Sequence, residues 1–228
     1  MKTLLSWAVS LLVISGAAFA QTEDATPADE YVEVELSGGA SMPMRFYFPD
    51  DFDPHREYPV MISVGTYFLH DDPSEFGWVV VRAGVADRQY SVEQSAEALD
   101  YIASRLNVAS DRFHIFGYSA SSAGVFRIAA ALPDRFRGVL VMPGHPRQRS
   151  EYAPLSDMQT RFIVGENDGY WLRESQSAHR RFVDLGTDAD IEIIADGGHV
   201  LSELSGRPLF ERIDAEFGAG ARAHGARH

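Results

Sequence analysis

The sequence predicts a single α/β domain with three layers, in which a mostly parallel central sheet has helices on both faces. Two observations lead to this prediction. Short, continuously apolar runs recur along the 228 residues, as in strands that are buried on both faces. Segments with the apolar spacing of a helix fall between most of these runs. Alternation of strands and helices in this way is typical of a parallel sheet between two helical layers.

The first two predicted strands differ from the later ones. Residues 31–36 and 44–48 alternate polar and apolar side chains, which predicts an antiparallel pair at the edge of the sheet. The later runs are more continuously apolar, so we expect them to be buried on both faces. They are residues 60–64, 78–81, 113–116, 139–142, 162–164 and 191–194.

Four segments have the pattern of a helix. They are residues 92–106, 123–132, 171–185 and 201–217, the last interrupted near Gly206 and Pro208. In the first of them, Leu99 and Ile102 fall on one helical face. The link over residues 65–77 is short and contains Asp71-Asp72-Pro73, so any helix there should be vestigial.

The two ends of the chain are expected to lie outside the folded domain. Lys2, an apolar run and Ala18-Phe19-Ala20 have the order of a secretory signal peptide, which predicts cleavage after Ala20 and a secreted or periplasmic protein. This apolar run is too short to span a membrane. We expect residues 1–20 to be the signal, 21–30 a flexible acidic segment, 31–217 the domain and 218–228 a flexible tail.

Composition excludes several kinds of chemistry. The chain has no cysteine, which rules out thiol nucleophiles and disulfides, and Lys2 is its one lysine, which rules out a Schiff base in the mature protein. With 33 acidic and 20 basic residues, the formal charge of −13 argues against nucleic-acid binding. We expect no cofactor, and the sequence does not predict the oligomeric state. His70, Asp71 and Asp72 are adjacent, and adjacent residues rarely converge on one ion, so no metal site is expected.

Residues 113–124, F-H-I-F-G-Y-S-A-S-S-A-G, have the pattern of a nucleophile elbow: an apolar strand, a tight Gly-x-Ser turn and then a helix. Such a turn exposes the serine hydroxyl, so Ser119 is the candidate nucleophile. The motif G-x-S-x-G is imperfect, because Ser121 replaces its last glycine. Ser122 is a weaker choice, since it has Ala120 where Ser119 has Gly117. The alternative is an ordinary strand exit in which a serine caps the next helix.

A serine nucleophile needs a histidine that takes its proton and a carboxylate that orients the histidine. In an elbow-type enzyme the acid and then the histidine follow later strands. Asp168 comes after the strand predicted at 162–164, with Glu166 as second choice, and His199 comes after the strand at 191–194. Two glycines before His199 permit a tight loop.

From about residue 31 to 217 the chain resembles the alpha/beta-hydrolase superfamily. In particular, it is similar to small secreted serine esterases of the dienelactone hydrolase and polyhydroxybutyrate-depolymerase-like groups. Pro133-Asp134-Arg135-Phe136, between the elbow helix and the next strand, carries this resemblance together with the elbow. The resemblance implies an exported serine hydrolase that cleaves small or polymeric carboxylic esters through an acyl-enzyme, with Ser119, Asp168 and His199 as its triad. The alternative is a hydrolase-fold protein, non-catalytic or weakly active, that binds a ligand or partner.

The oxyanion loop departs from the resemblance. Relatives usually carry His-Gly after the third strand, where this chain reads Ser-Val-Gly-Thr-Tyr over residues 63–67. One donor should be the backbone N–H of Ala120, and the second is expected from Thr66 or Tyr67.

The aromatic residues next to the triad are candidates for substrate binding. Tyr118 precedes the nucleophile, and Tyr170 and Trp171 follow Asp168, where they are expected to form a substrate wall or to pack at the start of a helix. Residues 144–149, which contain a histidine and two arginines, form either a lid or substrate-anion contact or an ordinary surface loop.

Overall fold

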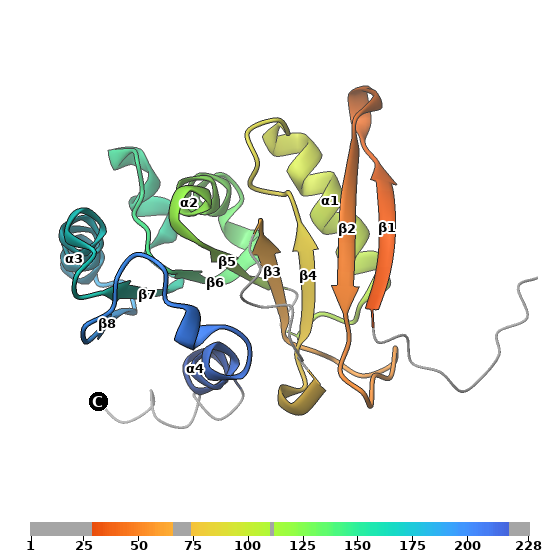
Figure 1. The fold of residues 1–228 in the computed structure, drawn as a ribbon. Coiled ribbons are helices and arrows are strands. Elements are labelled where there is room, and N and C mark those ends of the chain that lie inside the picture. Colours follow the sequence, from red (N-terminus) through yellow and green to blue (C-terminus); the bar gives the residue numbers. More distant parts are fainter. Residues whose placement is uncertain (1–28, 66–73, 110–111, 219–228) are drawn as a thin grey trace, which may run out of the picture.

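A computed structural model describes residues 29–65, 74–109 and 112–218, which form one eight-stranded sheet with helices on both faces (Figure 1). The strands are β1 (Asp29–Glu35), β2 (Ser41–Tyr47), β3 (Val60–Val64), β4 (Val79–Ala83), β5 (Phe113–Gly117), β6 (Phe136–Val141), β7 (Gln159–Gly165) and β8 (Ala189–Ile194). The α-helices are α1 (Val92–Arg105), α2 (Ser122–Ala131), α3 (Gly169–Asp184) and α4 (Arg207–Phe217). Each strand and helix expected from the sequence is present, and the predicted fold class is confirmed.

The sheet has the strand order β1-β2-β4-β3-β5-β6-β7-β8. β2 pairs antiparallel with β1 and with β4, whereas the pairs from β4 through β8 are all parallel. The chain therefore starts with the expected antiparallel edge pair and then continues as a parallel sheet. Because parallel strands all point the same way, the loops that follow β5, β7 and β8 emerge at one edge of the sheet.

Helices α1, α2 and α3 cover one face of the sheet, and α4 covers the other (Figure 1). On the first face Phe126 of α2 stacks on Phe162 of β7, and Phe182 of α3 packs against the same ring at a tilt. On the second face Phe210 and Ile213 of α4 belong to a separate apolar cluster under the sheet. The two clusters are the two interfaces of a three-layer sandwich.

Local sequence signals set the ends of the helices. Ser91 caps α1: its hydroxyl accepts the Gln94 N–H, and the Gln94 side chain accepts the Ser91 N–H. Gly206 has a positive φ of 71° and Pro208 stands in the first turn of α4. The interruption expected near these two residues is thus the boundary between a short 3₁₀ turn, Ser202–Leu204, and α4.

One expectation about burial was wrong. Residues 191–194 were expected to be buried on both faces, but β8 is the last strand of the sheet and is only partly buried. Glu192 is exposed, and the Ile193 side chain is 42% exposed. The apolar run could not show that this strand lies at the edge of the sheet. At that edge, β8 has a neighbouring strand on one side only, and its side chains stay partly exposed.

Several expectations concern residues beyond those described. The signal peptide and the segment 21–30 lie entirely or almost entirely before Asp29, and the tail lies almost entirely after Gly218. Of the link 65–77, the structure describes Gly65 and a 3₁₀ turn at Ser74–Phe76. In the described part of the chain, none of the helices has the length and apolar character needed to cross a membrane.

Candidate active site

Ser119 lies in a 3₁₀ turn, Ser119–Ser121, that joins β5 directly to α2. Its φ of 50° lies in the left-handed region, which is uncommon for a residue other than glycine. Strand and helix are close together here, because a Cβ on Gly117 would lie 2.7 Å from the Val125 side chain and 3.2 Å from the Ser122 nitrogen. This sharp turn is the geometry expected of a nucleophile elbow.

The two neighbouring serines stabilise the turn. The Ser121 hydroxyl accepts a hydrogen bond from the Tyr118 N–H (2.9 Å) and donates one to the Tyr118 carbonyl oxygen (2.8 Å). Ser122 is fully buried, and its hydroxyl donates to the Ser119 carbonyl oxygen at 2.5 Å. Serine at position 121 therefore fits where the motif has glycine, and its hydroxyl is engaged with backbone groups.

Ser119, His199 and Asp168 form a continuous series of hydrogen bonds. The Ser119 Oγ lies 2.8 Å from Nε2 of His199, and Nδ1 of His199 lies 2.6 Å from Oδ2 of Asp168. The Asp168 side chain is 11% exposed and that of His199 is 39% exposed, so the carboxylate is shielded while the imidazole borders solvent. The structure thus brings together the three residues chosen from the sequence, at the ends of β5, β7 and β8.

Glu166, the second choice for the acid, has a different contact. Its Oε2 accepts the backbone N–H of Asp196 at 3.1 Å, and its side chain is exposed. Asp168 immediately precedes α3, whose N-terminal end carries a partial positive charge that favours a nearby carboxylate. Both geometry and local charge therefore make Asp168 the partner of His199.

Tyr118 and Trp171 contact His199 from different elements. The Tyr118 hydroxyl donates to the His199 carbonyl oxygen at 3.2 Å. Burial, together with the negative charge of Asp168, raises the pKa of Tyr118, which keeps its hydroxyl a neutral donor. The Trp171 indole lies nearly parallel to the His199 ring, with centroids 5.9 Å apart and an angle of 24°. Both side chains limit how far the imidazole can move.

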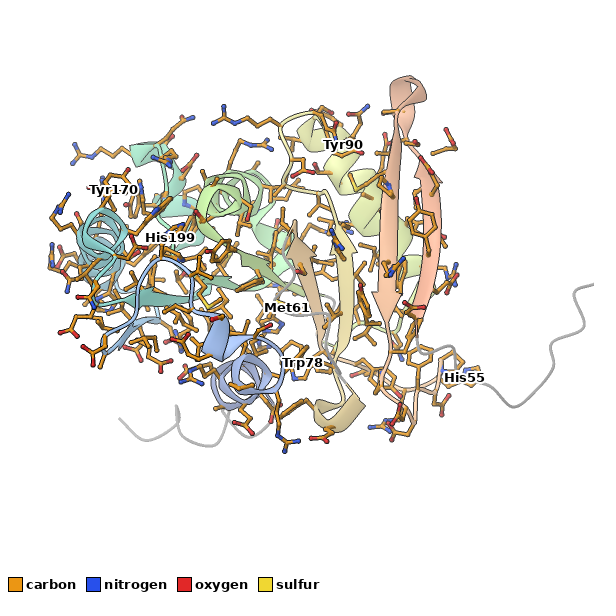
Figure 2. All side chains as sticks on the ribbon, in the orientation of Figure 1. His55, Met61, Trp78, Tyr90, Tyr170 and His199 are labelled. Atoms are coloured by element: carbon orange, nitrogen blue, oxygen red, sulfur yellow. The ribbon has the colours of Figure 1, made fainter. Side chains whose placement is uncertain are left out.

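Tyr170 extends this aromatic surface. Its ring meets the Trp171 ring edge-on at 5.3 Å, and 47% of its side chain is exposed. Figure 2 shows Tyr170 and His199 on the α3 side of the molecule. Val200, next to His199, is 61% exposed. An apolar and aromatic rim of this kind suits the apolar part of an organic ligand.

No protein-family model matches the chain, and no curated protein sequence does. Solved structures do resemble it. A thermostable esterase has a TM-score of 0.56 at 16% identity, over 75% of this chain and 55% of the esterase. Fungal esterases from Rhizomucor miehei have a TM-score of 0.59 at 11% identity, over 86% and 82%. Dipeptidyl peptidase 4 of Porphyromonas gingivalis has a TM-score of 0.59 at 15% identity, over 83% and 35%.

These likenesses, with the strand order and the elbow after β5, decide the fold. The chain has the α/β-hydrolase fold. This confirms the predicted fold, while membership of the superfamily and the likeness to the dienelactone hydrolase and polyhydroxybutyrate-depolymerase groups stay predictions. The chain spans only about half of the thermostable esterase and a third of the peptidase, so the α/β-hydrolase fold is what these relatives share with it.

In this α/β-hydrolase fold one expected oxyanion donor is described and the other two candidates are not. The Ala120 N–H directly follows Ser119, the candidate nucleophile, in the turn before α2, and Ala120 is exposed. Thr66 and Tyr67 lie outside the described residues. Gly65, just after β3, has a positive φ of 63°, a conformation that favours glycine.

The loop after β6 supplies side chains that the sequence left ambiguous. His145 is only 8% exposed, and its ring contacts those of Tyr170 (6.2 Å) and Trp171 (5.7 Å). The Arg147 guanidinium lies over the Trp171 ring, 5.6 Å from its centroid. The order of the strands could have identified this loop. Strands β6 and β7 are parallel neighbours, so the loop after β6 emerges beside the loop that carries Asp168.

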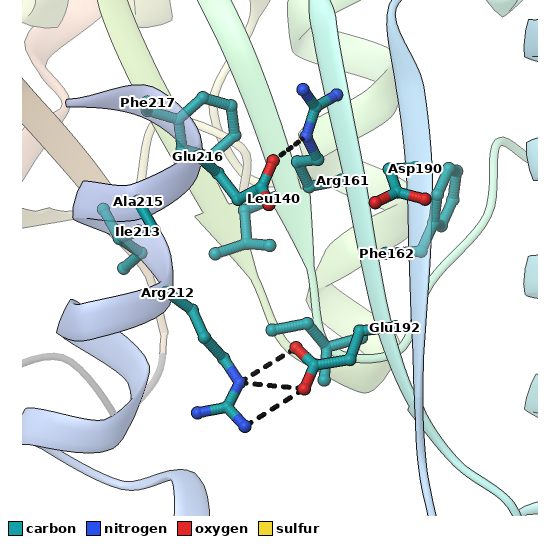
Figure 3. Close-up of a pocket in the computed structure, with 11 residues that line it drawn as sticks. Leu140, Arg161, Phe162, Asp190, Glu192, Arg212, Ile213, Ala215, Glu216 and Phe217 are labelled. Atoms are coloured by element: carbon teal, nitrogen blue, oxygen red, sulfur yellow. Dashed lines mark hydrogen bonds and ion pairs between the residues drawn. The ribbon is translucent and has the colours of Figure 1, made fainter. Parts of the chain in front are cut away.

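A small cavity of about 100 Å³ lies away from the triad, between α4 and strands β7 and β8 (Figure 3). Four of the charged groups that line it form ion pairs: Arg212 with Glu192 at 2.9 Å and Arg161 with Glu216 at 2.5 Å. These pairs join α4 to the sheet, and the cavity contains none of the triad residues, so it is no candidate for the reaction. Among the described residues, no cluster of three or more histidine, aspartate or glutamate side chains is arranged to hold a metal ion.

Proposed function

We propose that this chain is an exported serine hydrolase that cleaves carboxylic esters. The observation that carries the proposal is the pair of distances from Ser119 to His199 (2.8 Å) and from His199 to Asp168 (2.6 Å). A serine, a histidine and a shielded carboxylate in this order are the components of nucleophilic acyl transfer. The esterases among the structural neighbours support the choice of substrate class.

Each member of the triad has one role. His199 accepts the Ser119 proton at Nε2 while its Nδ1–H donates to Asp168, and Ser119 Oγ attacks the ester carbonyl carbon. The tetrahedral oxyanion is held by the Ala120 N–H and by a second donor from Thr66 or Tyr67. When the intermediate collapses, His199 returns the proton to the departing alcohol, which leaves an acyl group on Ser119.

Water completes the cycle. It loses a proton to His199 as it attacks the acyl-enzyme, and collapse of the second tetrahedral intermediate releases the acid and regenerates Ser119. Tyr118, Tyr170 and Trp171 border the space where the ester lies, with Tyr118 also fixing the His199 backbone. Each step of the proposed reaction is assigned to a side chain of the triad or to a backbone N–H group.

A fluorophosphonate probe tests the nucleophile directly. The mature protein and its Ser119→Ala variant would be treated with the probe, and hydrolysis of p-nitrophenyl acetate and butyrate followed in parallel. We expect labelling and turnover in the wild type and the loss of both in Ser119→Ala. Ser121→Ala is the matched control: it removes a hydroxyl that contacts Tyr118 rather than His199, and it should still be labelled.

The same experiment separates the alternatives. A folded wild-type protein that neither labels nor hydrolyses esters would overturn the proposal in favour of a ligand-binding protein. Faster cleavage of a dipeptide 4-nitroanilide than of the esters would point to a peptidase. Export is tested separately: N-terminal sequencing of the protein from the periplasm or medium should begin at Gln21, and recovery of the uncut chain in the cytoplasm would contradict it.

A further inference from the structure

Arg147 places a positive charge beside the triad. Its guanidinium lies over the Trp171 ring, 5.6 Å from the ring centroid, and its Nη1 lies 3.3 Å from the Tyr170 hydroxyl. Trp171 in turn stacks on His199. The charge is therefore one aromatic ring away from the imidazole that receives the Ser119 proton.

No carboxylate among the described residues, 29–65, 74–109 and 112–218, forms an ion pair with the charge of the Arg147 guanidinium. Glu151, the carboxylate of the same loop, is 7% exposed, and its Oε2 accepts the backbone N–H groups of Arg147 (2.8 Å) and Gln148 (3.1 Å). Glu151 thus fixes the loop backbone and leaves the Arg147 side chain available to a ligand.

The part of the loop just before Arg147 is held in a defined position. Ser175 of α3 is fully buried, and its hydroxyl donates to the Gly144 carbonyl oxygen at 3.0 Å. Nδ1 of His145 lies 2.9 Å from the Pro146 carbonyl oxygen, and the His145 ring is buried against Trp171. Because the loop is fixed before ligand binding, binding at Arg147 does not have to order the loop backbone.

We propose that Arg147 is an anion subsite that binds a carboxylate of the substrate, so that the preferred esters carry a free acid group. The inference rests on the proposed function. A guanidinium presents two parallel N–H donors that match a carboxylate, and stacking on an aromatic face leaves its edge free for that contact.

Paired substrates test the subsite on each side of the ester. On the acyl side, the mono-4-nitrophenyl esters of adipic and suberic acid would be compared with 4-nitrophenyl hexanoate and octanoate. On the alcohol side, 4-acetoxybenzoate would be compared with 4-acetoxybenzamide. For at least one pair, we expect Arg147→Gln to reduce kcat/KM for the anionic ester about tenfold or more, mainly through KM, with the neutral ester changed less than about threefold. The affected pair identifies the side that carries the carboxylate.

Three further measurements sharpen the test. Arg147→Lys keeps the charge but loses the planar fork, so it should restore the anionic rate only in part. Arg149→Gln removes the same charge from the same loop, and within the described residues Arg149 contacts neither Tyr170 nor Trp171, so the anionic preference should persist. Added salt should weaken the preference in the wild type.

The contrary results are distinct. Equal losses on the anionic and neutral esters in Arg147→Gln would overturn the subsite and make Arg147 a support for Trp171. Equal effects of Arg147→Gln and Arg149→Gln would overturn it in favour of a general surface charge. Failure of the wild type to hydrolyse any ester or to label with fluorophosphonate would overturn the hydrolase itself, and the subsite with it.

Discussion

Gly165 and Gly197 lie backbone to backbone between the end of β7 and the loop after β8. A Cβ on Gly165 would collide with the carbonyl oxygens of Gly197 and Gly198. The same two loops are joined by the Asn167 N–H, which donates to the Gly197 carbonyl oxygen at 2.8 Å. This contact sets the spacing between the loop that carries Asp168 and the loop that carries His199.

Gly165→Ala should therefore impair activity more than a glycine-to-alanine substitution at a less crowded position of the same loops. The added Cβ must displace the loop of His199, and small displacements of catalytic groups are costly, so we expect kcat/KM for p-nitrophenyl butyrate to fall about tenfold or more. Gly198→Ala is the matched control, because a Cβ there meets open space. If both variants retained wild-type activity, close packing at Gly165 would not control the position of His199.

The sequence predicted the sheet, its helices and the members of the candidate triad because these depend on local patterns. Apolar runs marked the strands, and the elbow around Ser119 is a short-range feature in which sharp turning requires small residues. Asp168 and His199 could be chosen because the end of a parallel strand fixes which edge its loop occupies. In a repeating β/α pattern, the order of the elements along the chain therefore predicts which loops lie at the same edge of the sheet.

Other features depend on contacts between distant segments, which local patterns do not contain. The sequence showed that Trp171 follows Asp168 but not that its ring stacks on His199, and Arg147 was one of two arginines in an ambiguous loop. The weak burial of β8 follows from its place at the edge of the sheet. An apolar run in the sequence does not show whether its strand lies at the edge or in the centre of a sheet.

Ser121 should contribute to stability rather than to chemistry. Ser121→Ala removes the hydrogen bonds of the hydroxyl with the Tyr118 N–H and carbonyl oxygen, so we expect the free energy of unfolding to fall by about 1 kcal/mol. Urea denaturation measures this change. Ser177→Ala, at an exposed position of α3, should change stability by less than about 0.5 kcal/mol. An equal effect of the two substitutions would mean that the Ser121 contacts contribute nothing specific.

Trp171 should act as a positioning residue for His199. Trp171→Leu removes the ring that stacks on the imidazole, so we expect kcat for p-nitrophenyl acetate and the rate of fluorophosphonate labelling to fall about tenfold. Trp171→Phe keeps an aromatic face and should restore most of both rates. A change in KM alone, with labelling unaffected, would instead show that Trp171 contacts substrate without orienting His199.

Tyr118 should make stability depend on alkaline pH. Burial and the charge of Asp168 raise the pKa of Tyr118 in the folded protein above the value of about 10 for an unfolded chain. The folded state therefore holds this proton more tightly, and the resulting stabilisation is complete below the unfolded pKa and is lost as the pH rises through the folded pKa. A phenylalanine at this position has no proton to lose.

Tyr118→Phe should accordingly be less stable than the wild type by about 1 kcal/mol at pH 7, because the hydrogen bond to the His199 carbonyl oxygen is gone. The difference between the two proteins should narrow as the pH rises above about 10, where only the wild type loses the contribution of this hydroxyl. Urea denaturation at pH 7, 9 and 10.5 measures both effects. Other tyrosines with a raised pKa, Tyr90 and Tyr152, titrate in both proteins and cancel from the comparison. A difference that stayed constant with pH would mean that the Tyr118 hydroxyl titrates alike in the folded and unfolded states.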